Sequence, residues 1–185
     1  MNMERLDKKG IEEILLMLDK EISKSLDQPP VKFSLIAVGG TALTLRDIKA
    51  STKDVDFMLE GIVLEKLKVY IRKIYEKKKC KIDVWLSPNI FSTTLVSDYA
   101  ASPYGKTYRN FDVSILNFVD NAVAKLARFN EADREDIDSI IKAGASVTAI
   151  ARRFQETDKH GSFGNKQEAL GNFELFRKIY GLDKF

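Results

Sequence analysis

The chain has 185 residues, of which 44% are hydrophobic, 31% charged and 10% aromatic, as expected for one globular domain or one domain with a helical annex. Its single cysteine, Cys80, excludes an intrachain disulfide and a zinc site built from cysteines, and its single histidine, His160, excludes a two-histidine metal site. The net charge of +3 is too small to indicate a nucleic-acid-binding protein by itself. The first thirty residues contain no signal-peptide core and no membrane-length apolar run, so we expect a soluble, cytoplasmic protein that contacts no membrane.

The first half of the chain alternates between helical and extended patterns. Apolar spacing predicts a helix over residues 3–27, which Gln28-Pro29-Pro30 would end. A buried strand over Val31–Val38 would run into a glycine pair and then a short helix over about 42–48, with Thr41 as its N-cap. The next expected elements are a strand, a helix and a strand, at Asp54–Leu59, 62–77 and Lys81–Leu86.

The second half is mostly helical. Residues 87–109 are expected to form a loop with a short hairpin arm, and Phe111–Leu116 a further strand. From residue 117 the pattern is helical, with breaks near 129–131, 143–146 and 158–165. The order of elements favours an α/β (α+β) fold, a small mixed β-sheet flanked by helices and followed by a helical C-terminal region. The boundary would divide the chain into a core, residues 1–116, and a helical region, residues 117–185.

Two carboxylates interrupt the predicted strand Asp54–Leu59. Because the side chains of a strand alternate between its faces, Asp54 and Asp56 leave one face while Val55 and Phe57 enter the core. Carboxylates this close repel each other unless a cation lies between them, and Mg²⁺ prefers carboxylate and phosphate oxygens. The alternative is an accidental pair on an exposed strand.

A third carboxylate, Asp83, favours the metal hypothesis. Its neighbours Ile82 and Val84 must face the core, so Asp83 points toward the face of the first two carboxylates if the two strands are adjacent. Three carboxylates on neighbouring strands can hold two cations about 4 Å apart, the arrangement used for in-line displacement at phosphorus.

The segment Gly39-Gly40-Thr41 follows a predicted strand and precedes a predicted helix. A glycine pair there lets the backbone approach a phosphate, which the free amides of the next helix would bind. The alternative is a tight turn with no ligand. Arg46, farther along the helix, would add a cation to the site, pair with Asp47 or face solvent.

Several motifs follow one another along the chain: Gly39-Gly40-Thr41-Ala42-Leu43, Arg46, Thr52-Lys53-Asp54-Val55-Asp56-Phe57 and Asp83. In these motifs and their order, the chain resembles the nucleotidyltransferase superfamily typified by DNA polymerase beta. The resemblance implies that superfamily's core fold, Mg²⁺ or Mn²⁺ as cofactor and a nucleoside triphosphate as donor. It assigns the catalytic and metal-binding roles to Asp54, Asp56 and Asp83, and nucleotide binding to Gly39, Gly40, Thr41 and Arg46. Within the superfamily the chain is most similar to small prokaryotic proteins related to the AbiEii-type toxins of type IV toxin–antitoxin systems.

A second block, Val123–Arg128 followed by Asp133–Ile137, resembles the Lys…Lys/Arg-Asp-x-x-Asp helix pair of these proteins. Lys125 and Arg128 share one side of a predicted helix, and Asp133 aligns with apolar positions of the next helix, where a carboxylate needs a cation. One hypothesis aims Lys125 at the nucleotide phosphates, held by Asp133; the other is a structural ion pair between the two helices. Arg128, Asp133 and Asp136 are expected to give structural support.

The leading hypothesis is a metal-dependent nucleotidyltransferase that moves a nucleoside monophosphate from a nucleoside triphosphate to a hydroxyl of an RNA or protein acceptor. The alternative is a non-catalytic module on the same fold that binds a nucleotide or a cognate partner chain. A third hypothesis is the toxin of a two-component system.

Overall fold

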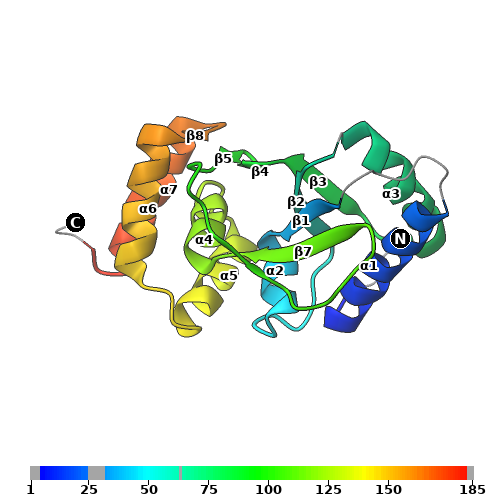
Figure 1. Ribbon diagram of the computed structural model, residues 1–185. Coiled ribbons are helices and arrows are strands. Elements are labelled where there is room, and N and C mark those ends of the chain that lie inside the picture. The colour runs from blue at the N-terminus through cyan, green and yellow to red at the C-terminus, as the bar shows by residue number, and fades with distance from the viewer. Residues whose placement is uncertain (1–4, 25–31, 63, 183–185) are drawn as a thin grey trace. The chain divides into compact units, whose positions relative to one another are not determined.

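The computed structural model describes residues 5–24, 32–62 and 64–182. The chain divides into two compact units (Figure 1). The first unit comprises residues 1–87 and 101–115, and the second comprises residues 88–100 and 116–185. Each unit is described by itself.

The first unit is built on a mixed sheet of five strands. Its spatial order is β3-β2-β1-β7-β6, with the bounds β1 Phe33–Ala37, β2 Val55–Glu60, β3 Ile82–Leu86, β6 Ala101–Pro103 and β7 Phe111–Leu116. Strand β1 is antiparallel to β2 and parallel to β7, and β2 is parallel to β3. The predicted small mixed sheet is thus confirmed. The predicted Gln28-Pro29-Pro30 stop and the first residue of the predicted strand Val31–Val38 lie outside the described residues.

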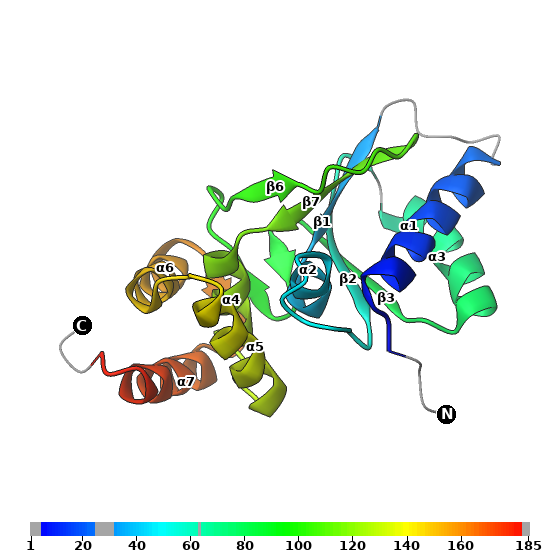
Figure 2. The same ribbon diagram turned by 90° about the horizontal axis from the view of Figure 1, so that it is seen from below.

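Two helices, α1 (Lys8–Ser23) and α3 (Leu64–Lys78), lie side by side on one face of this sheet (Figure 2). Helix α1 begins later than residue 3 because Asp7 is its N-cap and accepts a hydrogen bond from Gly10 N at 2.8 Å. The apolar stripes of both helices pack on the inward residues of the strands. That core includes Ile14, Leu18, Leu67, Ile74, Leu35, Phe57 and Val113.

Helix α2 (Gly39–Leu45) begins directly after β1. Its N-cap is Val38 and not Thr41, so the predicted start of this helix was wrong by about one turn. The physical reason is Gly39, whose φ of +57° lets the backbone turn into the helix three residues earlier than a side-chain cap at Thr41 would. Thr41 therefore lies within the first turn of α2.

In its described residues, the second unit contains four helices and a small three-stranded sheet. The helices are α4 (Phe118–Leu126), α5 (Glu131–Lys142), α6 (Val147–His160) and α7 (Lys166–Ile179), and the sheet joins β4 (Asn89–Ile90), β5 (Thr93–Thr94) and β8 (Ser162–Phe163). The predicted breaks between the helices hold polar N-caps, whose side chains each accept a backbone amide hydrogen bond. These caps are Asn117, Asn130, Ser146 and Asn165.

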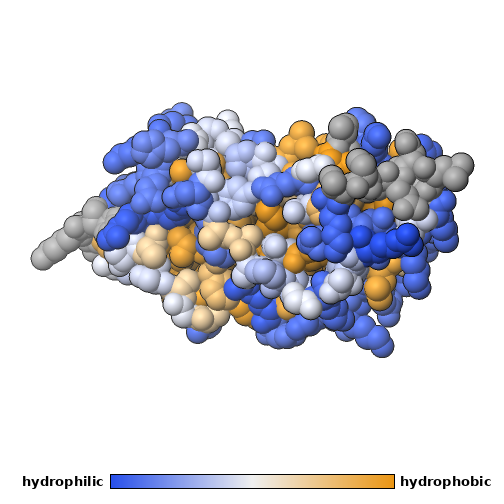
Figure 3. All heavy atoms as spheres, viewed as in Figure 1, coloured by the Kyte–Doolittle hydropathy of each residue, from blue (hydrophilic) through white to orange (hydrophobic). Residues whose placement is uncertain are grey.

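Packing in the second unit centres on α6. Its inner side stacks Phe154 on Phe173 of α7, with ring centroids 4.3 Å apart, while hydrophilic residues cover its outer side (Figure 3). Arg153 of α6 joins Asp120 Oδ1 of α4 at 2.6 Å and Asp98 Oδ1 at 2.8 Å. These ion pairs attach the segment 88–100 to the helices, although the sequence boundary near residue 116 had grouped that segment with the core. Within the described ranges, no helix is both long and apolar enough to cross a membrane.

Candidate active site

The acidic residues of the sequence signature lie at one end of the five-stranded sheet. Asp56 in β2 and Asp83 in β3 are register partners on adjacent parallel strands, and Asp54 directly precedes β2. Their strand neighbours pack into the core under α1 and α3, so these carboxylates leave the opposite face. Asp56 is only 8% exposed, whereas the Asp83 side chain is 30% exposed. The structure therefore brings Asp56 and Asp83 to one face of two neighbouring strands, with Asp54 immediately before β2.

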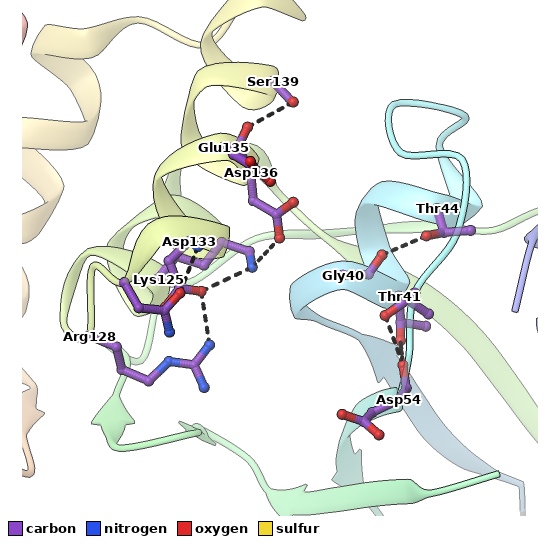
Figure 4. A network of polar contacts seen from close by, with 12 residues as sticks. Gly40, Thr41, Thr44, Asp54, Lys125, Arg128, Asp133, Glu135, Asp136 and Ser139 are labelled. Atoms are coloured by element: carbon purple, nitrogen blue, oxygen red, sulfur yellow. Dashed lines mark hydrogen bonds and ion pairs between the residues drawn. The ribbon is translucent and has the colours of Figure 1, made fainter. Parts of the chain in front are cut away.

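A pair of hydroxyl groups fixes the backbone that carries the first two carboxylates. Thr41 Oγ1 accepts a hydrogen bond from Asp56 N at 2.9 Å and donates one to the Asp54 carbonyl at 3.3 Å (Figure 4). Thr52 Oγ1 donates to the same carbonyl at 3.0 Å. The Thr41 side chain is fully buried, and its hydroxyl joins the first turn of α2 to the acidic strand.

Glycine is required at the two positions of the turn for different structural reasons. Gly39 adopts the left-handed backbone that starts α2. A Cβ atom on Gly40 would lie 2.7 Å from Thr52 Oγ1, so a side chain here would force Thr52 or the helix to shift. The two glycines thus form a tight turn from β1 into α2, and this turn brings the backbone of α2 directly against the start of β2.

Lys81 forms an ion pair with one carboxylate of the acidic face. Its Nζ lies 2.6 Å from Asp83 Oδ2, and its side chain is 55% exposed. Lysine and aspartate two residues apart on one strand share a face, so the ion pair follows from the pleat of the chain entering β3. The hydrogen bond with Asp83 and the attraction of Asp54 and Asp56 hold the pKa of Lys81 above its ordinary value.

The thiol of Cys80, next to Lys81, is influenced by the charges of the same carboxylates. Burial and the negative charges of Asp54 and Asp56 raise the pKa of its thiol to about 11. The two carboxylates therefore act on the chain that enters β3, as expected if the ends of β2 and β3 lie together.

The donor set suits a hard divalent cation. Asp54 Oδ1 is buried and has no hydrogen-bond partner among the described residues, and Asp56 projects from the same face. A buried carboxylate oxygen without a partner is costly unless a cation reaches it. However, no group of three or more acidic, histidine or cysteine side chains in the described ranges is arranged to hold a metal ion. The three-carboxylate cradle expected from the sequence is thus not preassembled, since Asp83 binds Lys81.

Arg46 is the C-cap residue of α2. One terminal nitrogen of its guanidinium donates to Ser102 Oγ at 3.0 Å and to the Ile115 carbonyl at 3.3 Å. Burial lowers the pKa of this guanidinium below its ordinary value. These contacts connect α2 to β6 and β7, a structural role that was not among the three considered from the sequence.

The second block forms a buried charge cluster in the second unit (Figure 4). Lys125 Nζ lies 2.6 Å from Asp136 Oδ2 and 3.4 Å from Asp133 Oδ1, and all three side chains are at most 8% exposed. This is the ion pair between two helices that the structural alternative requires. Asp136 is the nearer partner, although the sequence had emphasised Asp133.

Arg128 completes this cluster at its exposed side. Its guanidinium lies 3.0 Å from Asp133 Oδ1 and 4.1 Å from the ring centre of Phe91, with 39% of the side chain exposed. The structural support expected of Arg128, Asp133 and Asp136 stays a prediction, and these ion pairs are the contacts through which the residues would give it.

Two residues with direct contacts at the acidic face were missed from the sequence, Lys81 and Thr52. Lys81 could have been found, because alternation from Asp83 places it on the same face. The contact between Thr52 and Gly40 depends on how a loop folds back on a helix, and no local pattern predicts it.

A mixed sheet, a glycine turn into a helix and acidic residues on two neighbouring strands are the organisation of a nucleotidyltransferase core. The sequence model of a family described as "Nucleotidyltransferase of unknown function (DUF6036)" matches residues 13–171. The chain belongs to this family. No curated protein and no solved structure matches the chain.

Proposed function

We propose that the protein is a divalent-metal-dependent nucleotidyltransferase. The observation that carries this proposal is the placement of Asp56 and Asp83 in register on adjacent strands, beside Asp54 with its unpartnered buried oxygen. Membership of a nucleotidyltransferase family supports it independently. The acceptor hydroxyl would attack the α-phosphorus of a nucleoside triphosphate, the bond to the β-phosphate would break, and pyrophosphate and one proton would be released.

Each part of the site has a defined task in this proposal. Asp54 and Asp56 would hold Mg²⁺ or Mn²⁺, and Asp83 would complete the acidic face at which the acceptor hydroxyl is activated. When bound, the cation would neutralise phosphate charge and lower the pKa of the attacking hydroxyl. Thr41 and Thr52 position the backbone of the acidic strand. The backbone of Gly39 and Gly40 would approach the triphosphate, since a glycine turn allows close contact.

The experiment is a transfer assay with the full chain, Mg²⁺ and each α-³²P-labelled nucleoside triphosphate, with total RNA and desalted cell protein as acceptors. We expect label in one acceptor class with the wild-type protein and none with Asp54→Asn or Asp56→Asn. Asp112→Asn is the matched control, because Asp112 is an exposed carboxylate at the other end of the same sheet, where it pairs with Lys32. Label transfer that survives Asp56→Asn would contradict the proposal.

The relation to AbiEii-type toxins belongs to the same proposal and rests on the sequence resemblance. It predicts that expression arrests growth only while Asp54, Asp56 and Asp83 are intact. Binding of a triphosphate without transfer to either acceptor class would instead favour the non-catalytic module.

A further inference from the structure

We propose that residues 64–81, which form helix α3 and the start of its connection to β3, bind RNA on their outward side. This basic segment carries eight lysine or arginine side chains and two glutamates, whereas the whole chain has a net charge of only +3. The rest of the chain is therefore net acidic. The inference rests on the proposed function and deepens it, because it selects RNA over protein as the acceptor.

Three cations of the basic segment lie on the surface along one stripe. Lys68, Arg72 and Tyr75 follow one another at steps of four and three residues, which places them on one side of α3. The ammonium of Lys79 lies 5.8 Å from the centre of the Tyr75 ring, so it continues this stripe beyond the end of the helix. All four side chains are exposed, because α3 turns its other side, with Ile74, into the core.

Ion pairs neutralise only part of this charge. Four cations of the segment pair with glutamates, as Lys68–Glu65, Arg72–Glu76, Lys77–Glu21 and Lys78–Glu13. The side chains of these four cations are between 45% and 83% exposed. Exposed pairs of this kind contribute little free energy. Phosphate groups would therefore replace the glutamates at low cost.

The composition of the outward side favours a polynucleotide. Phosphate groups recur at every nucleotide, so a row of exposed cations matches RNA better than a folded protein acceptor. Tyr75 is 45% exposed within this row, and a base stacks on such a ring. A helix that binds a membrane surface needs a free apolar side, whereas the apolar side of α3 is buried in the core.

The basic segment leads directly to the acidic face. Helix α3 ends at Lys78 and β3 begins at Ile82, at the end of the sheet where Asp83 and Asp56 are register partners. The chain from residue 78 to Asp83 spans at most about 18 Å when fully extended. An RNA strand that lies along α3 would therefore bring a ribose hydroxyl toward the carboxylates at which the proposed transfer takes place.

The test measures the fluorescence anisotropy of a labelled single-stranded RNA of about 16 nucleotides, titrated with the full chain at several salt concentrations. We expect binding that weakens as the salt concentration rises, because phosphate contacts release counterions. The triple variant Lys68→Gln/Arg72→Gln/Lys79→Gln should bind the RNA at least about tenfold more weakly and with a flatter salt dependence.

Lys142→Gln/Lys159→Gln/Lys178→Gln is the matched control, because it removes the same charge from exposed lysines of the second unit. It should bind the RNA like the wild-type protein. Tyr75→Leu should weaken binding by about fivefold or more without a change in salt dependence, since leucine is apolar but offers no ring for a base. Unchanged affinity of Tyr75→Leu would overturn the stacking contact.

Absence of RNA binding by the wild-type protein, or equal weakening by the two triple variants, would overturn the inference. Tighter binding of poly-glutamate or of anionic lipid vesicles than of the RNA would overturn RNA as the partner. Label transfer to cell protein and not to RNA would also overturn it and would leave the proposed function standing. Triphosphate binding with Mg²⁺ should be equal in the wild-type protein and both triple variants, and its absence from all three would contradict the proposed function.

Discussion

Thr41 and Asp56 are joined by a hydrogen bond of 2.9 Å from the Asp56 amide to the Thr41 hydroxyl, which links the first turn of α2 to the acidic strand β2. Thr41→Val keeps the shape of the side chain but leaves a buried N–H without an acceptor. We expect it to lower the free energy of unfolding by about 1–3 kcal/mol, measured by urea denaturation.

Thr41→Ser is the control for this bond, because serine keeps the hydroxyl and loses one methyl group. It should retain more of the stability than Thr41→Val. Equal stability of Thr41→Val and the wild-type protein would show that the hydroxyl does not hold the strand.

Gly40→Ala tests the close approach of α2 to Thr52. Alanine normally stabilises a helix over glycine by roughly 0.5–1 kcal/mol, but here its Cβ would meet Thr52 Oγ1 at 2.7 Å. We therefore expect destabilisation, of about 1–3 kcal/mol, in thermal or urea unfolding. The double variant Gly40→Ala/Thr52→Ala should lose less than the sum of the two single variants, since the second change removes the clashing oxygen. Strict additivity would refute the steric explanation.

Lys125 is predicted to matter for stability through its two buried carboxylate partners. Lys125→Met removes the cation and leaves buried negative charge, which costs about 3–5 kcal/mol. In Lys125→Met/Asp136→Leu, part of that loss should return, because the nearer carboxylate is gone.

Lys142→Met, at the exposed end of α5, is the control for Lys125 and should change stability by no more than about 0.5 kcal/mol. A Lys125→Met protein as stable as this control, but with weakened triphosphate binding, would support the phosphate-contact hypothesis against the ion pair.

The Cys80 thiol gives a pH-dependent readout of the acidic face. Burial, followed by the charges of Asp54 and Asp56, raises its pKa from the ordinary 9.0 to about 11. The folded state therefore keeps a proton that the unfolded state loses, so this group makes stability fall as the pH rises between those two values. The rate of iodoacetamide alkylation of the native protein should therefore have its midpoint near pH 11 and not near 9.0.

Asp56→Asn should shift the alkylation profile of Cys80 to lower pH, because it removes one of the negative charges. A native profile centred on the ordinary thiol value would mean that the carboxylates do not act on this residue. Asp112→Asn, which alters a distant carboxylate on the same sheet, should leave the profile unchanged.

The sequence predicted those features that depend on local periodicity. Alternation predicted outward positions for Asp54, Asp56 and Asp83, and the adjacency of β2 and β3 brings Asp56 and Asp83 to one face. Contacts between distant segments were not predictable in this way. The buried Thr41 hydroxyl serves β2 because α2 starts at Gly39, and the segment 88–100 joins the second unit through Arg153 and Asp98. Such pairings depend on tertiary packing, which a local pattern does not encode.

The central claim, that the acidic face binds a metal–triphosphate complex, is tested most directly by equilibrium binding of labelled nucleoside triphosphates to the full chain with and without Mg²⁺. We predict binding of at least one triphosphate that requires Mg²⁺ and is lost in the double variant Asp54→Asn/Asp56→Asn, with Asp112→Asn unaffected. Failure of the wild-type protein to bind any of the four triphosphates in Mg²⁺, or binding that persists unchanged in the double variant, would contradict the account.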